Sequence, residues 1–468
     1  MISGDFSLLD WVVLVERELL LFAGVFFLVG AIDEFAVDIA WLWLRLTGRA
    51  PTLRFDPQRA TATDGADVGA AAIFVPAWCE RAVIGATIRH MLHVWREQDM
   101  RIYVGCYRND PETVEAVASA AGCDPRVRLV VHDDDGPTTK ADCLNRLYSA
   151  LEDDEARSGR RAAAVVLHDA EDMVDPAALA LIRCSLGRAD LVQLPVLPLP
   201  QPRSRWVGSH YCEEFAEAHG KALVVRDALG AGIPLAGVGC GISRDALGRL
   251  AAMRSGGAPF AADCLTEDYE LGLGIAEMGG RTRFLRRRAT DGRLIATRAY
   301  FPDRLGPAVR QKTRWIYGIA FQGWDRLGWH RSPAEIWMRL RDRRGPLTAL
   351  ILATAYLVLI VGGLAWALGL ANAGRAIDLS PALVPILVAN LASFAWRCAS
   401  RFAFTAREYG PIEGVRAVLR IPVANVIAIM AGRRALVAYV HSLRGQAFRW
   451  DKTEHSAHPA LVLREGIA

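Results

Sequence analysis

The chain contains an eleven-residue stretch, AAAVVLHDAED, that runs from Ala162 to Asp172. Its first six residues are apolar, as expected of a strand that is buried on both faces of a sheet. Three carboxylates follow within four residues, at Asp169, Glu171 and Asp172. Ligands of α/β folds bind at the carboxyl ends of the strands, so the stretch indicates both a fold class and the place of a site.

Similar apolar runs occur earlier in the chain and alternate with helical patterns. The predicted strands are Ala70–Val75, Arg101–Cys106, Val127–Val131 and Ala162–Leu167, and the predicted helices are Val83–Gln98, Glu112–Ala121 and Ala141–Leu151. Strands that alternate with helices of this length indicate a mostly parallel sheet with helices on its faces. We therefore predict an α/β fold for the middle of the chain.

The carboxylates after the last of these strands favour a metal site. Acidic side chains this close together repel one another, and a hard divalent cation such as Mg²⁺ or Mn²⁺ relieves that repulsion. Such a cation also bridges to the oxygens of a diphosphate. The alternative is a loop or a helix cap, and for the similar run Asp133–Asp135 we favour that alternative.

The composition excludes several classes of protein. The 468 residues carry a net charge of only +4, so we expect no nucleic-acid partner. The nine cysteines form no C-x-x-C pair, which is typical of a reducing compartment, and the ten histidines show no zinc-binding spacing. The glycines of Gly237–Gly241 resemble a dinucleotide loop only superficially, because they do not lie in the first strand-to-helix turn.

Apolar segments near both ends of the chain predict three membrane-spanning helices. Leu347–Ala371 has 25 residues without a charge and Leu379–Trp396 has 18, whereas Leu19–Ile32 has only 14 and extends towards Leu46 by including Asp33, Glu34 and Asp38. About 20 apolar residues cross a bilayer. In a spanning helix, those three acidic residues are expected to face other helices or the membrane interface.

A fourth apolar segment, Ile421–Gly432, is shorter and has arginines close to both its ends. We predict that it lies in the membrane interface, and the alternative is a fourth span. Arginines also cluster after the first predicted span, before the second and after the third. Because basic residues favour the cytoplasmic side, the middle of the chain is predicted to be cytoplasmic.

Two further groups of polar residues follow the sheet-forming region. Thr266-Glu267-Asp268 precedes a helical pattern, where a helix cap is the simplest interpretation. Gln311-Lys312-Thr313-Arg314-Trp315 joins an amide, a fixed cation and a large aromatic ring, which is also typical of a segment beside a bilayer.

Taken in order, these residues resemble the family 2 glycosyltransferases. The resemblance runs through Pro76, Glu80, Asp110, Lys140, Asp169-Ala170-Glu171, Thr266-Glu267-Asp268 and Gln311-x-x-Arg314-Trp315, and it covers roughly residues 70–345. More narrowly, it resembles the membrane-integrated branch that contains the cellulose, chitin and hyaluronan synthases. The stretches Gly136–Asn145 and Trp450–His455 are similar to the phage-adsorption protein B type of bacterial inner-membrane glycosyltransferase, whose members continue into a cyclic-di-GMP-sensing domain.

The resemblance implies a cytoplasmic GT-A type domain on the bacterial inner membrane and assigns a role to each residue. Donor-binding residues are Pro76, Glu80, Asp110, Lys140, Asp169, Gln311 and Arg314. Asp169, with Glu171 or Asp172, is implied to hold Mg²⁺ or Mn²⁺. Asp268 is implied to be the general base, with Glu267 beside it, and Trp315 to stack on the acceptor sugar. Displacement in one step inverts the anomeric configuration.

The predicted organisation follows from these assignments. It comprises an N-terminal transmembrane helix and juxtamembrane segment (1–60), the catalytic domain (61–300), interfacial helices (301–345), two transmembrane helices (346–400), an interfacial region (401–445) and a cytoplasmic tail (446–468). The implied donor is a UDP-hexosamine or UDP-hexose, and the implied acceptor is a growing polysaccharide. Single-sugar transfer to a lipid-linked acceptor, or a non-catalytic membrane scaffold or receptor component, are the alternatives. Membrane lipid and an outer-membrane export or receptor partner complete the expected partners.

Overall fold

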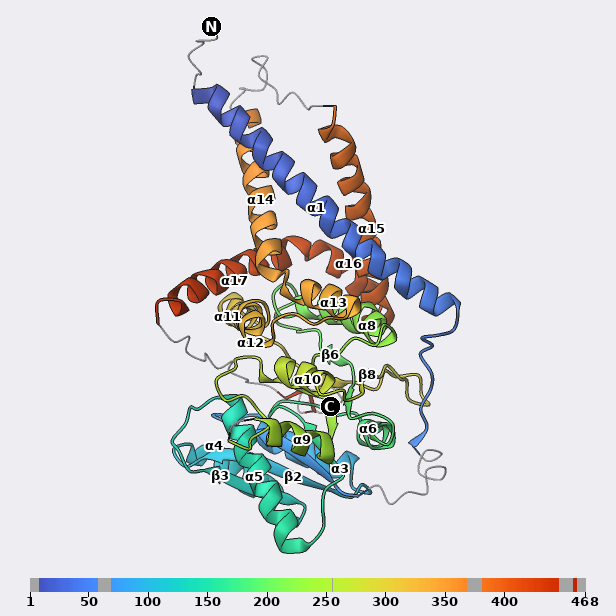
Figure 1. The fold of residues 1–468 in the computed structure, drawn as a ribbon, viewed down its shortest axis with the longest axis vertical. Helices are drawn as coiled ribbons and strands as arrows, with labels where there is room; N and C mark the ends of the chain where they lie inside the picture. The colour runs from blue at the N-terminus through green and yellow to red at the C-terminus, as the bar shows by residue number, and fades with distance from the viewer. Residues whose placement is uncertain (1–7, 58–68, 255, 368–380, 446–457, 461–468) are drawn as a thin grey trace.

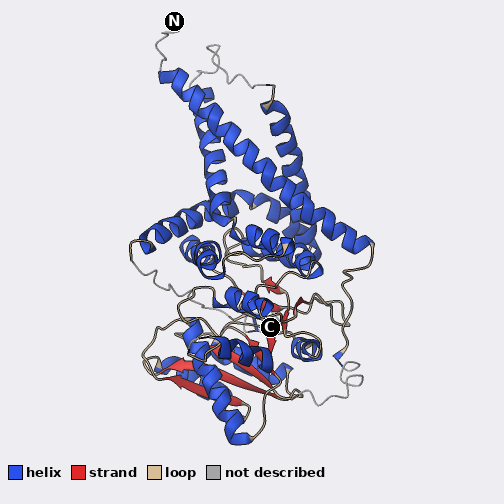
Figure 2. Cartoon of the chain, in the orientation of Figure 1, coloured by secondary structure: helices blue, strands red, loops and turns tan. Residues whose placement is uncertain are grey.

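The molecule consists of a group of long helices above an α/β domain, with a layer of shorter helices between them (Figure 1). This computed structural model describes residues 8–57, 69–254, 256–367, 381–445 and 458–460. The predicted stretch Trp450–His455 lies outside the described residues. Figure 2 shows that the strands gather at the end of the molecule away from the long helices.

A seven-stranded sheet forms the centre of the α/β domain, with the strand order β3-β2-β1-β4-β7-β5-β8. The strands are β1 (Ala71–Pro76), β2 (Met100–Tyr107), β3 (Val127–His132), β4 (Ala164–Leu167), β5 (Leu191–Gln193), β7 (Cys240–Ser243) and β8 (Thr282–Phe284). β7 runs antiparallel to β4 and β5, and the other neighbours are parallel. The predicted mostly parallel α/β fold is confirmed. A second sheet pairs β6 (Val196–Pro198) with β9 (Thr297–Ala299).

The inner strands of the central sheet are buried on both faces, which explains why β1 and β4 are continuous apolar runs. In β1, Ile73 and Val75 face the hydrophobic core beneath α3 (Ile84–Val94) and α6 (Ala178–Leu186). Phe74 faces the opposite core. That second core is covered by α5 (Lys140–Ser158) and α9 (Arg244–Met253), while α4 (Pro111–Ala121) packs against α3.

The three predicted spans are present as long helices. They are α1 (Leu8–Leu46), α14 (Gly345–Ala367) and α15 (Leu383–Tyr409). Each is long and apolar enough to cross a membrane. The predicted end of the second span at Ala371 and the start of the third at Leu379 fall outside the described residues.

The fourth apolar segment forms α17 (Ile421–Ser442), which follows α16 (Pro411–Leu419). Among the described residues α17 is a fourth helix long and apolar enough to span. In Figure 1, however, it runs across the foot of the upright helices, and it packs against α11 (Leu305–Ile316) as well as α14. Arg433 and Arg434 are exposed near its middle. Its position in the membrane interface stays a prediction, with a fourth span as the alternative.

The acidic residues of α1 face other helices, as predicted. Asp33 accepts hydrogen bonds from Trp337 Nε1 (2.7 Å) and Arg344 Nη1 (2.7 Å). Asp38 pairs with Lys221 Nζ (2.5 Å) and accepts a hydrogen bond from Trp396 Nε1 (2.7 Å). These contacts tie α1 to α13 (Pro333–Arg343), to α15 and to the π-helix η1 (Ala218–Ala222).

The remaining helices lie between the sheet and the long helices. They are α7 (His210–Glu217), α8 (Leu223–Ala228), α10 (Glu267–Glu277), the π-helix η2 (Tyr317–Gln322) and α12 (Gly323–Leu327). α10 and α11 carry the last two polar groups of the sequence. The intermediate layer therefore brings them to the carboxyl edge of the sheet.

Candidate active site

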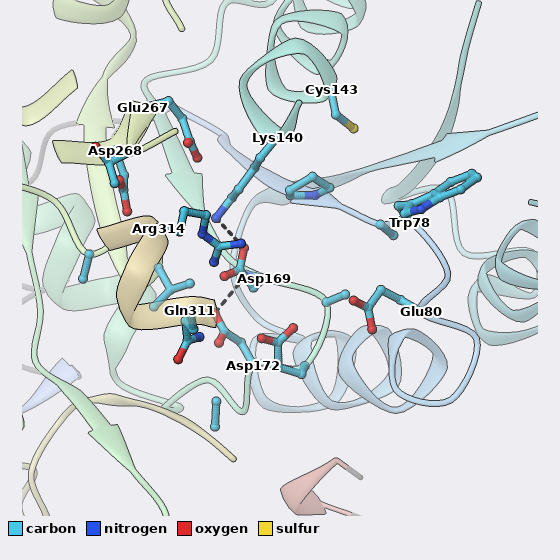
Figure 3. Close-up of a pocket in the computed structure, with 18 of the residues that line it drawn as sticks. Trp78, Glu80, Lys140, Cys143, Asp169, Asp172, Glu267, Asp268, Gln311 and Arg314 are labelled. Atoms are coloured by element: carbon cyan, nitrogen blue, oxygen red, sulfur yellow. Dashed lines mark hydrogen bonds and ion pairs between the residues drawn. The ribbon is translucent and has the colours of Figure 1, made fainter. Parts of the chain in front are cut away.

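A cleft lies between the carboxyl ends of the strands and α11. Its lining contains every residue that the sequence predicted for the site except Asp110, namely Pro76, Glu80, Lys140, Asp169, Glu171, Asp172, Glu267, Asp268, Gln311, Arg314 and Trp315. Figure 3 shows the labelled members of this set converging from several elements. The sheet edge, α10 and α11 thus build one site from segments that are far apart in the chain.

Asp110 is not among the residues that line the cleft. It caps α4, where Oδ1 accepts a hydrogen bond from Thr113 N (3.3 Å), and Oδ2 accepts one from Cys79 N (2.6 Å). Glu80 N donates to Thr113 Oγ1 (2.9 Å). Asp110 therefore braces the loop after β1, which presents Trp78 and Glu80 to the cleft. Direct contact between Asp110 and a donor stays a prediction.

In the acidic loop after β4, one carboxylate stabilises the loop and another faces the cleft. Asp172 is 2% exposed, and its Oδ2 accepts hydrogen bonds from His168 Nδ1 (2.8 Å) and Asp169 N (3.0 Å). Burial raises the pKa of Asp172, and the contact with His168 opposes that rise. The Asp172 carboxylate is thus used to shape the loop, while Asp169 is turned towards the cleft, about a third exposed.

Lys140 stands at the centre of the charged groups. It is the first residue of α5, and its Nζ lies 2.5 Å from Asp169 Oδ1. Burial opposes its charge, but Asp169, Glu267 and Asp268 outweigh that effect and raise its pKa. Lys140 is therefore a fixed cation at the point where the acidic loop meets α10.

Glu267 and Asp268 form a coupled acidic pair in the first turn of α10. Burial and the Asp268 charge raise the pKa of Glu267 to about 7, against the opposing field of Lys140. Burial also raises the pKa of Asp268, while Lys140 lowers it. A carboxyl group whose pKa lies near 7, as that of Glu267 does, can take up and release a proton near neutral pH.

Gly237 allows the acidic pair to approach the sheet. Its φ is +77°, and a Cβ there would lie 2.7 Å from Asp268 Oδ2 and 3.2 Å from Lys140 Nζ. The neighbouring Val238 lines the cleft. The sequence signal was present in the glycine cluster, but its purpose is visible only in the fold, where a side chain would collide with Asp268.

Helix α11 supplies the third side of the cleft. Gln311, Arg314 and Trp315 are spaced i, i+3 and i+4, so they share one face of the helix. That face points into the cleft in Figure 3 for Gln311 and Arg314. The packing of α11 against α17 places this helix at the side of the domain nearest the long helices.

Several aromatic residues of the cleft were not predicted. Trp78 and Tyr107 meet edge to face with centroids 5.1 Å apart. At the other end of the cleft, the Trp315 ring lies 6.3 Å from Phe215 and 6.5 Å from Phe301. Flat apolar rings of this kind suit the face of a base or of a sugar. Phe215 and Phe301 lie in no recognisable motif, so nothing in the sequence indicated them.

His458 supports the acidic loop from behind. Its side chain is buried, and its Nε2 lies 3.3 Å from the backbone oxygen of Asp172. Its ring lies 6.5 Å from that of His90, which contacts Val174 O (2.9 Å) through Nε2. The described residues 458–460 thus return to the loop that carries Asp169.

The donor set of the cleft suits a divalent cation that is shared with a substrate. Six carboxyl side chains, at Glu80, Asp169, Glu171, Asp172, Glu267 and Asp268, line it together with the cations Lys140 and Arg314. In the described part of the chain, no three His, Cys, Asp or Glu side chains form a complete metal site. Mg²⁺ characteristically uses one or two protein carboxylates and completes its shell with substrate phosphates and water. The residues present therefore fit such an ion.

Comparison with known proteins identifies the class of the domain. The model of the family described as glycosyltransferase like family 2 matches residues 69–318. The chain therefore belongs to this glycosyltransferase family, and its α/β domain is of the GT-A type. The resemblance stated from the sequence is confirmed.

Two curated relatives are similar to most of the chain. The chain is 33% identical over 455 residues to bacteriophage adsorption protein B of Escherichia coli strain K12, and equally so to bacteriophage N4 adsorption protein B of Escherichia coli O157:H7. Each alignment covers 92% of this chain and 61% of the relative. The chain thus spans about three fifths of the length of these relatives. Its described residues include four helices long and apolar enough to cross a membrane, so it is a membrane protein.

Solved structures with a similar arrangement are more distant. A mannosyltransferase from Pyrobaculum calidifontis, in complex with GDP-mannose and Mn²⁺, has a TM-score of 0.48 at 17% identity, covering 90% of this chain and 99% of that one. Glucosyl-3-phosphoglycerate synthase from Mycobacterium tuberculosis, in complex with Mg²⁺ and UDP, has a TM-score of 0.33 at 17% identity, covering 54% and 78%.

Proposed function

We propose that the protein is an inverting, metal-dependent glycosyltransferase that moves a sugar from a UDP-hexosamine or UDP-hexose to a growing polysaccharide. The observation that carries the proposal is the placement of Asp268 in one cleft with the Lys140–Asp169 ion pair and Arg314. The Asp268 carboxylate supplies a base, and the cations Lys140 and Arg314 supply stabilisation for a departing diphosphate.

On the donor side, Asp169 and Glu171 are the carboxylates proposed to hold Mg²⁺ or Mn²⁺, because Asp172 is occupied in bracing the loop. A bound divalent cation there neutralises the diphosphate and makes it a better leaving group. Pro76, Glu80 and Trp78 border the part of the cleft proposed for the nucleotide. Gln311 and Arg314 reach the diphosphate from α11.

On the acceptor side, Asp268 takes the proton of the attacking hydroxyl. The bond from that oxygen to the anomeric carbon forms as the bond to the diphosphate oxygen breaks, and the electron pair leaves with the diphosphate. Attack from the face opposite the leaving group inverts the anomeric centre, and no second nucleophile is required. Trp315, Phe215 and Phe301 are proposed to hold the acceptor sugar by its ring face.

The variant Asp268→Asn tests the assignment of the base. It keeps the size of the side chain but cannot accept the proton, so we expect sugar transfer to fall at least about a hundredfold while UDP still binds. The control is Asp263→Asn, which changes an exposed carboxylate paired with Arg326. Wild-type turnover of UDP-sugar by Asp268→Asn would show that another group is the base.

The arrangement at the membrane also supports a second candidate function, single-sugar transfer to a lipid-linked acceptor. The acceptor end of the cleft lies on α11, which packs against α17 at the foot of the long helices. A lipid-linked acceptor can reach this position from the bilayer surface. A donor screen on membranes followed by mass analysis separates the candidates: a ladder of products indicates a polysaccharide, and a single added sugar indicates the lipid-linked acceptor. If no donor in the screen releases UDP in a metal-dependent way, the result would support a non-catalytic scaffold or receptor component.

The proposed location is the bacterial inner membrane with the α/β domain in the cytoplasm. Free cysteines in the domain and arginines beside the spans support this orientation. The proposal leaves room for an outer-membrane export or receptor partner, as the names of the relatives suggest. Labelling of Cys79, which is exposed, by a membrane-impermeant thiol reagent should occur only after the inner membrane is opened.

A further inference from the structure

Four arginines from three distant segments gather at the foot of α1 and α15, and three of them contact the carboxylate of Glu408. They are Arg45 in the last turn of α1, Arg286 and Arg288 in the segment that follows β8, and Arg407 near the end of α15. We call these four residues the arginine cluster. None of them lines the catalytic cleft.

The contacts join the four side chains into one group. The carboxylate of Glu408 accepts a hydrogen bond from Arg286, and Arg288 Nη2 lies 2.9 and 3.0 Å from its two oxygens. Arg407 Nε lies 3.6 Å from the same carboxylate. On the other side, Thr52 Oγ1 accepts from Arg45 Nη1 (3.1 Å) and Arg286 Nη1 (3.4 Å).

The backbone holds this group in place. Arg288 N donates to Leu53 O (3.0 Å), and Phe55 N donates to Arg288 O (2.8 Å). The segment after α1 and the segment after β8 are therefore fixed side by side. The convergence of Arg45 and Arg286 on Thr52 follows from this pairing, so it does not depend on the side chains alone.

The charges of the cluster are not balanced. Among the described residues, Glu408 is the only carboxylate that pairs with any of the four arginines. Yet the Arg286 side chain is 6% exposed and that of Arg288 is 23% exposed. A guanidinium group keeps its proton in a protein, so the excess positive charge cannot be removed by titration. Like charges that are withdrawn from water favour an added anion.

Two details at Arg286 point in the same direction. Its Nε is buried and has no hydrogen-bond partner. Burial, together with the nearby charges of Arg407 and Arg288, lowers its pKa to about 10 against the opposing effect of Glu408. An anion beside Arg286 would satisfy the orphan donor and offset the repulsion.

The position of the cluster indicates the source of that anion. Trp43, Leu42 and Leu46 are exposed on the same end of α1, and Arg49 lies over the Trp43 ring at 4.4 Å. An exposed tryptophan with arginines next to it is typical of the membrane–water interface. The anions concentrated at the cytoplasmic surface of a bilayer are the headgroup phosphates of acidic phospholipids.

We propose that the arginine cluster binds the headgroup of an anionic phospholipid such as phosphatidylglycerol. The paired N–H groups of arginine match the oxygens of a phosphate, and the lipid completes the charge that Glu408 leaves uncompensated. Because the cluster joins α1, α15 and the segment after β8, a bound lipid fixes the α/β domain at the membrane surface. This inference is independent of the proposed sugar transfer.

Lipid binding to the detergent-solubilised full chain tests the proposal, with native mass spectrometry to count bound phosphatidylglycerol and phosphatidylcholine. The test variant combines Arg288→Gln with Arg407→Gln. The control combines Arg433→Gln with Arg434→Gln, which removes the same charge from exposed positions on α17. We expect the test variant to lose phosphatidylglycerol affinity by about tenfold or more and the control to change by less than about twofold. Equal losses in both, or none in the test variant, would overturn the proposal.

Two further measurements keep the outcome clear. Glu408→Gln removes the competing carboxylate and should raise the affinity for phosphatidylglycerol, whereas a fall in a variant that melts at the wild-type temperature would count against the site. Inorganic phosphate in millimolar excess should leave the lipid bound. If phosphate displaces it completely, the cluster is a site for a soluble anion and the lipid assignment is wrong.

Discussion

At the scale of single residues, the described lining of the cleft has six carboxyl side chains but only two cations, Lys140 and Arg314, to balance them. Lys140 contacts Asp169 and also lowers the pKa values of Glu267 and Asp268. The same ammonium group therefore serves the donor side and the acceptor side of the proposed reaction. Its removal should be visible on both sides, in different measurements.

Lys140→Met should shift the pH profile of the enzyme. Burial raises the pKa of Asp268 and brings that of Glu267 to about 7, while Lys140 opposes both rises. A general base is active when deprotonated, so kcat/KM falls as the pH drops through its pKa. Without the lysine the pKa rises further, and the acid limb of kcat/KM should move to higher pH. A lower rate with an unmoved acid limb would mean that Lys140 acts on the donor alone.

Gly237→Ala should damage catalysis more than stability. The added Cβ would lie 2.7 Å from Asp268 Oδ2, so it displaces the proposed base. Gly230→Ala is a matched control, because Gly230 also has a positive φ (+68°) but open space around its Cβ. Both variants should lose about 1 kcal/mol of stability from the backbone. Only Gly237→Ala should lose at least about tenfold in kcat, and similar rates for the two would contradict the role of Gly237.

At the scale of elements, the return of residues 458–460 to the acidic loop gives a testable dependence. His458→Ala removes the contact with Asp172 O and leaves a gap beside His90. Loosening of the loop should raise the Mn²⁺ concentration needed for half-maximal transfer by a few-fold, with a stability loss of about 1–3 kcal/mol. His458→Gln can keep the hydrogen bond and should recover most of the metal response. If His458→Ala needs the same Mn²⁺ concentration for half-maximal transfer as the wild type, His458 contributes only to packing.

The elements differ in how well the sequence predicted them, and the reason is physical. β1, β2 and β4 are almost entirely buried, so each is a mostly apolar run with a helix after it, whereas the edge strand β3 is partly exposed. β5 and β8 have only three residues each, which is too short for any periodicity to show. The antiparallel course of β7 depends on its partners β4 and β5 rather than on its own composition.

The site shows the same division. Residues in compact polar groups, such as Asp169–Asp172 and Gln311–Trp315, were predicted because the spacing itself carries the signal. An aspartate at the start of a helix is a common cap, so that role of Asp110 was predictable. The hydrogen bond that Asp110 accepts from Cys79 N was not. Phe301 and His458 join the site only through tertiary packing, which no local pattern records.

At the scale of the whole molecule, a buried ion network holds the α/β domain to the long helices. Lys221, which is 2% exposed, pairs with Asp38 (2.5 Å) and with Glu217 (2.7 Å). Arg397 extends the network to Glu34 (3.0 Å) and Glu217 (2.8 Å). These ion pairs thus link α1 and α15 to the α7–η1 segment of the α/β domain.

Lys221→Met should destabilise the protein by about 3–5 kcal/mol, because Asp38 would keep its charge in a buried place without its lysine partner and Glu217 would keep only Arg397. The double variant Lys221→Met with Asp38→Asn should recover part of this loss, since it also removes one unpaired charge. Melting in detergent, followed with a dye that reacts with the buried cysteines, measures both. A double variant as unstable as the single one would show that Lys221 acts through packing instead of charge.

The sequence separations in this network set an order of events during synthesis. Asp33 is bound by Arg341, 308 residues later, and Glu34 by Arg397, 363 residues later. At a translation rate of about 5–20 residues per second, Arg341 follows Asp33 by roughly 15–60 s. Throughout that interval the acidic face of α1 lacks these partners, and the intervening α/β domain has time to fold. Helix α1 is synthesised before these partners and is therefore among the last elements to reach its final position.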